Sequence, residues 1–186
     1  MTVGVKHARL VDLVYAWLTP FTDIRSAKEM TGGSSDAEFM RINQFYMETS
    51  QNMAKYQGLK AAGKEIELKY LGVYVLTVTD NSTFKGILNI ADTVTAVNDK
   101  TFESSKEMVD YVNSQTLGDK VKVTYQEDGK VKTAEGKIIT LENGKNGIGI
   151  GLIDRTEVSS DVPIKFSTAG IGGPSAGMMF SLSIYT

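Results

Sequence analysis

The chain contains no cysteine and only one histidine among its 186 residues. Without cysteine it can form neither a disulfide framework nor a cysteine-based metal site, and one histidine cannot build a histidine-rich metal cluster. Basic blocks are also missing and the formal net charge is -2, which argues against a nucleic-acid partner. No run of about 18 apolar residues occurs, so nothing in the chain is predicted to span a membrane. We therefore predict no metal site and no cofactor.

Hydrophobic residues make up 41% of the chain, which is enough to build a core. The length suits one large domain or two small ones. Changes in residue pattern divide the chain into a helix-containing region over residues 1–66, a compact module over 67–141 and a third segment over 142–186. Because the module combines short strands with one or two helices, the predicted fold class is α+β.

The first segment is predicted to hold a long helix over residues 35–62. Ser35 and Glu38 form a capping box, in which a hydroxyl at the N-cap is followed three residues later by a carboxylate. Behind it, apolar and aromatic residues recur at spacings of three and four, which places them on one helical face that indicates core packing. These residues are Phe39, Ile42, Tyr46, Met53 and Tyr56. Gly63 is predicted to end the helix.

The middle module is predicted to form strands around a short helix. Residues 70–79 and 91–98 are predicted strands, the first because it is rich in Val, Tyr and Thr. Residues 121–125 and 131–138 are predicted to form a hairpin around the tight turn Asp128-Gly129.

The short helix of the module is predicted from a second capping box, Ser104 with Glu107. Its inward face is expected to carry Met108, Val109 and Val112, and Leu117-Gly118 is expected to end it.

The third segment begins with a polar, glycine-bearing linker over residues 142–147. Residues 148–153 and 162–166 are predicted strands, and 175–185 is predicted to open a helix. The Met178-Met179-Phe180 side of that helix needs a core that the chain barely supplies. We therefore expect this segment to be the beginning of a truncated domain.

Three motifs, in the same order along the module, resemble PDZ domains. Tyr70-Leu-Gly-Val-Tyr-Val75 resembles their carboxylate-binding loop and the strand after it. Asp92-Thr-Val-Thr-Ala-Val-Asn-Asp99 resembles a strand of bacterial PDZ domains, with Ala91 in place of the usual glycine. Residues 118–129 resemble their late strand and turn. The resemblance implies a PDZ domain over residues 67–141.

A PDZ domain implies a peptide ligand. Converging backbone N–H groups can hold a terminal carboxylate, and a free strand edge, expected at residues 73–78, can accept an extended peptide. Met108 and Val112 would line an apolar pocket for one of its side chains. The residues expected to bind peptide are Leu71, Gly72, Val73, Tyr74, Val75, Met108 and Val112. The alternative is that the groove is occupied internally, or that the domain serves as a spacer.

One serine lies in a glycine-rich stretch near the end of the chain. Gly173-Pro-Ser-Ala-Gly177 fits the nucleophile elbow of α/β-hydrolases, but no predicted strand runs directly into it. The match to a phosphate-binding loop is weaker, because no Gly-Lys pair is followed by Ser or Thr. Ser175 could also simply cap a helix.

The wider motif Gly172-Gly-Pro-Ser-Ala-Gly177 resembles the nucleophile motif of Lon-type proteases, with Gly172 in place of the usual Asp. A PDZ module before it is similar to membrane-anchored Lon-like serine peptidases of Gram-positive bacteria, which include the streptococcal pheromone-processing peptidases. The resemblance implies a Ser–Lys dyad with Ser175 as nucleophile, and a turn formed by Gly172, Gly173 and Ala176 near the oxyanion. The family's lysine follows the serine, so we expect it beyond Thr186 and expect this chain alone to be inactive.

The same resemblance implies an ATP-independent, extracytoplasmic peptidase held at the membrane by an anchor that this chain does not contain. Its substrates would be peptides or flexible protein segments, including secreted signalling peptides. The alternative function is a PDZ-centred peptide-binding scaffold without catalysis. His7 is expected to be solvated, and Asp154, Glu157 and Asp161 are expected to form a charged loop rather than a carboxylate site.

Overall fold

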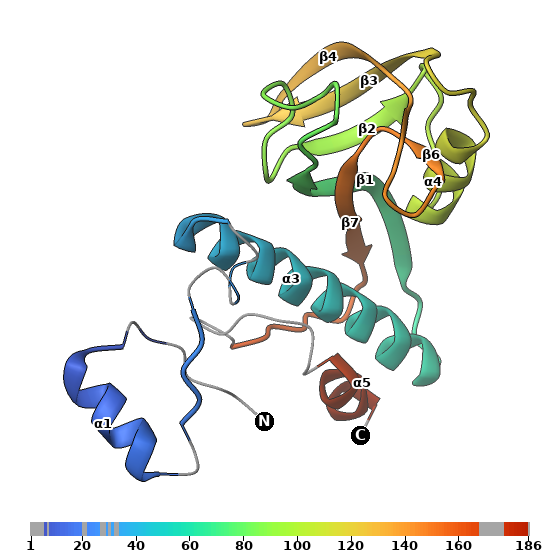
Figure 1. Cartoon of the computed structure of the whole chain (residues 1–186). Helices are drawn as coiled ribbons and strands as arrows, with labels where there is room; N and C mark the ends of the chain where they lie inside the picture. The colour runs from blue at the N-terminus through green and yellow to red at the C-terminus, as the bar shows by residue number, and fades with distance from the viewer. Residues whose placement is uncertain are drawn as a thin grey trace. The chain divides into compact units, whose positions relative to one another are not determined.

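The computed structural model describes residues 6, 8–19, 22–26, 29, 31, 34–167 and 177–185. The chain divides into two compact units, Met1–Met40 and Arg41–Thr186. The first unit contains helix α1 (Leu10–Leu18) and the start of α3 (Asp36–Ala61). The second unit contains the rest of α3 and every described strand (Figure 1). Among the described helices, none has the length and apolar character needed to cross a membrane.

Helix α3 forms where the sequence predicts it. Ser35 donates its backbone N–H and its hydroxyl to the Glu38 carboxylate, and the Glu38 N–H donates to the Ser35 hydroxyl oxygen. These hydrogen bonds lower the pKa of Glu38. The last turn closes at Gly63, whose φ of 70° requires the left-handed region. The predicted capping box and C-cap are therefore confirmed.

A five-stranded antiparallel sheet forms the centre of the second unit, in the order β4-β3-β2-β1-β7. Its strands are β1 (Glu67–Val78), β2 (Thr93–Val97), β3 (Lys120–Glu127), β4 (Lys130–Lys137) and β7 (Ile150–Ser159). A small second sheet pairs β5 (Ile139–Thr140) with β6 (Asn146–Gly147). The predicted hairpin is confirmed: β3 and β4 meet at Asp128-Gly129, both with positive φ.

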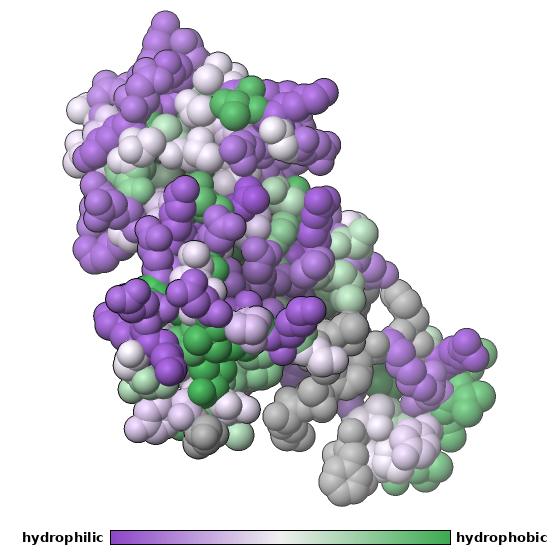
Figure 2. Space-filling view, turned by 180° about the vertical axis from the view of Figure 1, so that it is seen from behind, coloured by the Kyte–Doolittle hydropathy of each residue, from purple (hydrophilic) through white to green (hydrophobic). Residues whose placement is uncertain are grey.

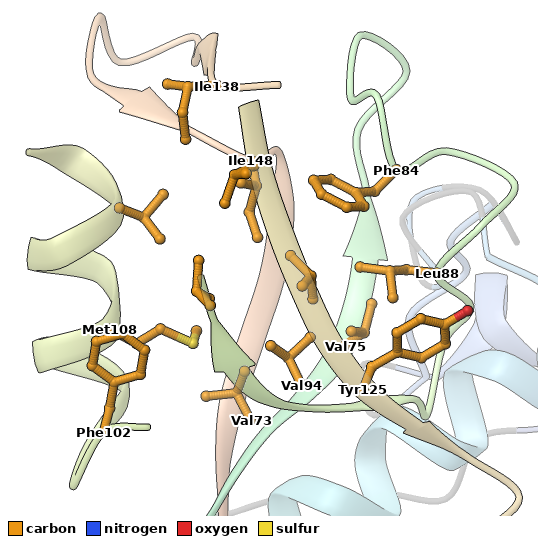
Figure 3. Packing of buried hydrophobic residues seen from close by; sticks show 14 residues of the cluster. Val73, Val75, Phe84, Leu88, Val94, Phe102, Met108, Tyr125, Ile138 and Ile148 are labelled. Carbon is orange, nitrogen blue, oxygen red and sulfur yellow. The ribbon is translucent and has the colours of Figure 1, made fainter. Parts of the chain in front are cut away.

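The two faces of the sheet carry different cores. Val73 and Val75 of β1 point to the face covered by α4 (Ser105–Asn113), and both are fully buried. That cluster also includes Phe84, Met108 and Ile148 (Figure 3). Because side chains alternate along a strand, Tyr74 and Leu76 point to the other face and pack with Phe45 of α3. The α+β fold class is thus confirmed.

Three local predictions are corrected. Residues 162–166 are not a strand: Pro163 cannot donate to a ladder, and Phe166 instead packs its ring on Phe180 at 4.6 Å. Helix α4 ends at Asn113, earlier than Leu117. Val109 is 36% exposed, because Met108 and Val112, one turn apart, already define the buried face.

Helix α5 (Gly177–Tyr185) packs against α3 within the second unit. A Cβ on Gly58 of α3 would lie 2.8 Å from Ile184, so glycine is needed for this close approach. Figure 2 shows hydrophobic side chains gathered over this end of the unit, where Met179 and Leu182 are 65% and 48% exposed. The helix predicted over residues 175–185 is confirmed from Gly177 onward.

Candidate peptide-binding site

Strand β1 does not present the free edge that the sequence predicts. On one side it pairs with β2, with Val73 opposite Val94. On the other it pairs with β7 along its whole length, from Glu67 opposite Ser159 to Val78 opposite Ile150. The prediction of a free edge at residues 73–78 is therefore wrong, because a segment distant in the sequence occupies that edge.

The residues predicted to bind peptide fall into three places. Val73, Val75, Met108 and Val112 are at most 5% exposed and lie in the core cluster. The Tyr74 ring stacks on Phe45 at 4.0 Å, on the opposite face of the sheet. Leu71 lines a polar cavity of about 270 Å³, together with Glu48, Asn52, Arg155, Thr156, Glu157 and Val158. The structure thus does not gather these residues into one open surface.

Gly72, which the sequence predicts to be part of a carboxylate-binding loop, lies in β1 and has a structural role there. Its φ is 127°, and a Cβ there would lie 2.2 Å from the carbonyl oxygen of Val94. The β1–β7 register also shifts between Tyr70 and Gly72. Glycine is thus required for an irregular strand and a close approach to β2.

Gly72→Ala is expected to lower the free energy of unfolding by at least about 2 kcal/mol, because backbone strain adds to the contact with Val94. Urea unfolding followed by circular dichroism measures this loss. Gly144→Ala is the matched control: its φ is 77° but no atom lies within 4 Å of the added Cβ. Equal losses for the two variants would show that the contact with Val94 contributes nothing.

The sheet ends in two edge strands, β4 and β7, and β7 is the one that lies beside β1. The Gly149 carbonyl accepts a hydrogen bond from the Thr79 N–H at 2.8 Å, so Gly149 faces β1. Backbone groups alternate in direction along an antiparallel strand, so those of Ile150 and Leu152 point outward. The carbonyls of Asp154 and Thr156 follow the same alternation and accept hydrogen bonds from side chains of α3.

Helix α4 runs antiparallel to β7 and is joined to this part of the chain at both ends. The Ser105 N–H, at the start of α4, donates to Asp154 Oδ1 at 3.2 Å. Asn146 Nδ2, just before β7, donates to the Gln115 carbonyl, just after α4, at 2.8 Å. Ile150 and Leu152 pack against the core cluster that contains Met108 and Val112. Strand β7 and helix α4 are therefore held side by side.

The segment that leads into β7 is rich in glycine: Gly147-Ile-Gly-Ile-Gly151. Gly149 has a φ of 73°, and a Cβ there would lie 2.5 Å from Thr79 Oγ1. The residue pattern predicts a linker over residues 142–147 and a strand over residues 148–153, whereas the structure places β7 at Ile150–Ser159. Its pairing with β1 is non-local, and no local pattern in the sequence indicates it.

Two buried hydroxyls lie where β1 pairs with β7. Tyr70 and Thr156 are opposite each other in the β1–β7 ladder, and neither hydroxyl has a hydrogen-bond partner within the described part of the chain. Burial raises the pKa of Tyr70, and the Asp154 and Glu107 carboxylates raise it further. Tyr70 therefore stays neutral beside two carboxylates.

The predicted catalytic residue Ser175 lies outside the described residues, as do Gly172, Gly173, Ala176 and His7. The prediction of a charged loop that contains Asp154, Glu157 and Asp161 is partly wrong. Asp154 and Glu157 lie in β7 because this segment pairs with β1.

Comparison with known proteins gives a consistent family. The model of the PDZ domain family matches residues 44–138, just over half of the chain. Three solved structures are similar over 43–47% of this chain. The PDZ domain of an SdrC-like protein from Listeria monocytogenes is 35% identical (93% of that chain, TM-score 0.44). Its counterpart from Listeria innocua is 38% identical (44% of this chain, 92% of that chain, TM-score 0.42).

A protein from Geobacillus thermodenitrificans is 30% identical, over 43% of this chain and 94% of that chain, with a TM-score of 0.39. No functionally curated protein matches the chain. The family match covers α4 and strands β1 to β4, and β7 lies beyond its last matched residue, Ile138. On the strength of a match over more than half of its length, this chain belongs to the PDZ domain family.

Proposed function

We propose that this PDZ domain, a type of domain that supports peptide-binding or regulatory roles, binds an extended peptide along the outer edge of β7. The observation that carries the proposal is the position of β7, at the edge of the sheet and beside α4. The start of α4 is joined to Asp154 of β7, and Gln115, just after α4, is joined to Asn146 of β6. A peptide added there would hydrogen-bond to the outward N–H and C=O groups of Ile150 and Leu152. Its side chains would then lie against α4.

The role of backbone pairing is tested by Ile150→Pro against Ile150→Ala. Both variants lose the isoleucine side chain, but only proline loses the outward N–H, and proline is tolerated as the first residue of an edge strand. We expect Ile150→Pro to bind peptides about three- to tenfold more weakly than Ile150→Ala, which corresponds to the loss of one hydrogen bond. Fluorescence anisotropy with labelled peptides that carry a free C-terminal carboxylate measures the affinities.

Thermal melting of each variant checks that the fold is retained. Equal affinities for the two variants would mean that the ligand does not pair with β7. If no peptide from a diverse set binds at concentrations near millimolar, the domain is a spacer.

A second function, that of a serine peptidase, is favoured by the sequence around Ser175 and by the helix that follows it. Helix α5 begins at Gly177, two residues after Ser175 in the sequence, and its packing on α3 fixes that helix start. Backbone N–H groups at a helix start favour negative charge, and an oxyanion beside the nucleophile would gain from them.

In this proposal Ser175 attacks the peptide carbonyl and a buried lysine takes its proton. That lysine, by resemblance to the Lon-like family, lies beyond Thr186. The PDZ domain would position substrates or regulate their access, in an ATP-independent enzyme tethered at the outer face of the membrane. A fluorophosphonate probe should attach covalently to Ser175 in the protein extended past Thr186. Intact-mass measurement that finds no adduct at Ser175 would contradict the proposal.

A further inference from the structure

The connection between β5 and β6 contains two Asn-Gly pairs close together, in the sequence Glu142-Asn-Gly-Lys-Asn-Gly147. An asparagine that precedes glycine is chemically labile. Because glycine has no Cβ, its backbone nitrogen can approach the side-chain amide carbon of the asparagine. The same reaction is open to Asn143 and to Asn146, and the surroundings of each residue decide which of them reacts.

Asn143 lies in an exposed turn that folds its side chain back over the main chain. The Lys145 N–H donates to Asn143 Oδ1 at 3.1 Å, which brings the side-chain amide over the peptide bond to Gly144 and polarises its carbonyl. Gly144 has a φ of 77°, and no atom lies within 4 Å of a Cβ built on it, so the reacting atoms are not crowded. Its N–H donates to the Leu141 carbonyl at 2.9 Å, a bond in a surface turn that opens easily.

Asn146 is held by the fold on every side of its reacting atoms. It pairs with Thr140 in the β5–β6 ladder. Its Nδ2, the nitrogen that would have to leave, donates to the Gln115 carbonyl at 2.8 Å. Gly147 is buried, and a Cβ on it would lie 2.6 Å from Leu141. Reaction at Asn146 therefore requires this part of the fold to open first.

We propose that Asn143 is a site of spontaneous modification and that the fold protects Asn146 from the same reaction. The Gly144 nitrogen gives its proton to solvent base and attacks Asn143 Cγ. The bond from Cγ to Nδ2 then breaks, Nδ2 takes up a proton, and ammonia leaves a succinimide ring. Water adds to one of the two ring carbonyls and breaks its bond to nitrogen. Opening at Cγ gives aspartate, and opening at the main-chain carbonyl gives isoaspartate. Water is the only reactant consumed.

The two products change the turn differently. Each places a new carboxylate next to Glu142, but only isoaspartate lengthens the main chain, by one methylene, since the chain then runs through Cγ. The turn is closed by the Leu141 N–H, which donates to the Lys145 carbonyl at 2.8 Å. The extra methylene lies between these two residues, so isoaspartate is expected to weaken this bond, whereas aspartate preserves the spacing of the turn.

Peptide mapping by mass spectrometry, after the full 186-residue chain is aged in mildly alkaline buffer, measures conversion at both sites. In the folded chain we expect Asn143 to convert at least about tenfold faster than Asn146, because the hydrogen bonds and burial around Asn146 must be lost first. In denaturing urea the two rates should agree within about threefold, because this protection is absent. Asn143→Gln should abolish conversion at this position, and the matched control Asn146→Gln should leave the rate at Asn143 unchanged.

Equal rates at the two sites in the folded chain would overturn the proposal. So would a folded chain in which Asn143 stays intact while the denatured chain converts. Hydrogen exchange tests the consequence: the Leu141 amide should exchange faster in the isoaspartate form than in the variant Asn143→Asp, which carries the charge without the extra methylene. Equal exchange in these two forms would contradict the expected weakening of the turn.

Discussion

Ser175→Ala should lower peptide cleavage by at least about three orders of magnitude in the protein extended past Thr186. Alanine offers no oxygen to attack the peptide carbonyl, and loss of a serine nucleophile typically leaves only the catalysis supplied by binding and oxyanion stabilisation. Cleavage of a peptide mixture, followed by mass spectrometry, measures the effect. Ser183→Ala is the control, because this serine lies on an exposed position of α5 and should leave cleavage unchanged.

The 186-residue chain belongs in the same experiment. If it cleaves peptides, the base that activates Ser175 lies within this chain and the proposed lysine is wrong. If the extended Ser175→Ala variant cleaves as well as wild type, Ser175 is not the nucleophile. If the extended wild-type protein is folded but cleaves no peptide, the result would favour a peptide-binding scaffold without catalysis.

The features predicted correctly from the sequence are those that neighbouring residues determine. The capping box of Ser35 and Glu38 requires residues three apart, and both the motif and the helix that it begins are present. The β3–β4 hairpin follows equally from Asp128-Gly129 between two alternating segments. Such signals involve few residues, so a single sequence is enough to recognise them.

The strand edge was mispredicted because its pairing is non-local. β1 and β7 are separated by more than seventy residues, from Val78 to Ile150, and no local pattern states which strand lies beside which. The motif Tyr70–Val75 was assigned to ligand binding by resemblance, whereas both edges of that strand are paired. Pairing with β7 closes that edge of β1, which the residues of β1 alone do not reveal.

Phe84 connects segments of the second unit that are distant in the sequence. It is fully buried between the turn that follows β1 and strand β4. A Cβ on Gly136 of β4 would lie 2.5 Å from its ring, so this glycine makes room for the phenylalanine. Its N–H donates to the Ser82 hydroxyl oxygen, and that hydroxyl donates to the Ile148 carbonyl just before β7. Phe84 and its neighbours thus link three segments that meet only in the folded chain.

Phe84→Ala is expected to lower the free energy of unfolding by about 3–5 kcal/mol, because it removes a large buried ring and leaves a cavity that its neighbours cannot fill. The midpoint of urea unfolding measures the loss, and Val131→Ala, at a 64% exposed position of β4, should change it by less than about 0.5 kcal/mol. Gly136→Ala should destabilise the wild type but cost less when combined with Phe84→Ala, since the added methyl then occupies vacated space. Additive losses in the double variant would mean that the ring and the glycine do not depend on each other. A loss below about 1 kcal/mol for Phe84→Ala would show that this side chain does not hold β4 to the segment before β7.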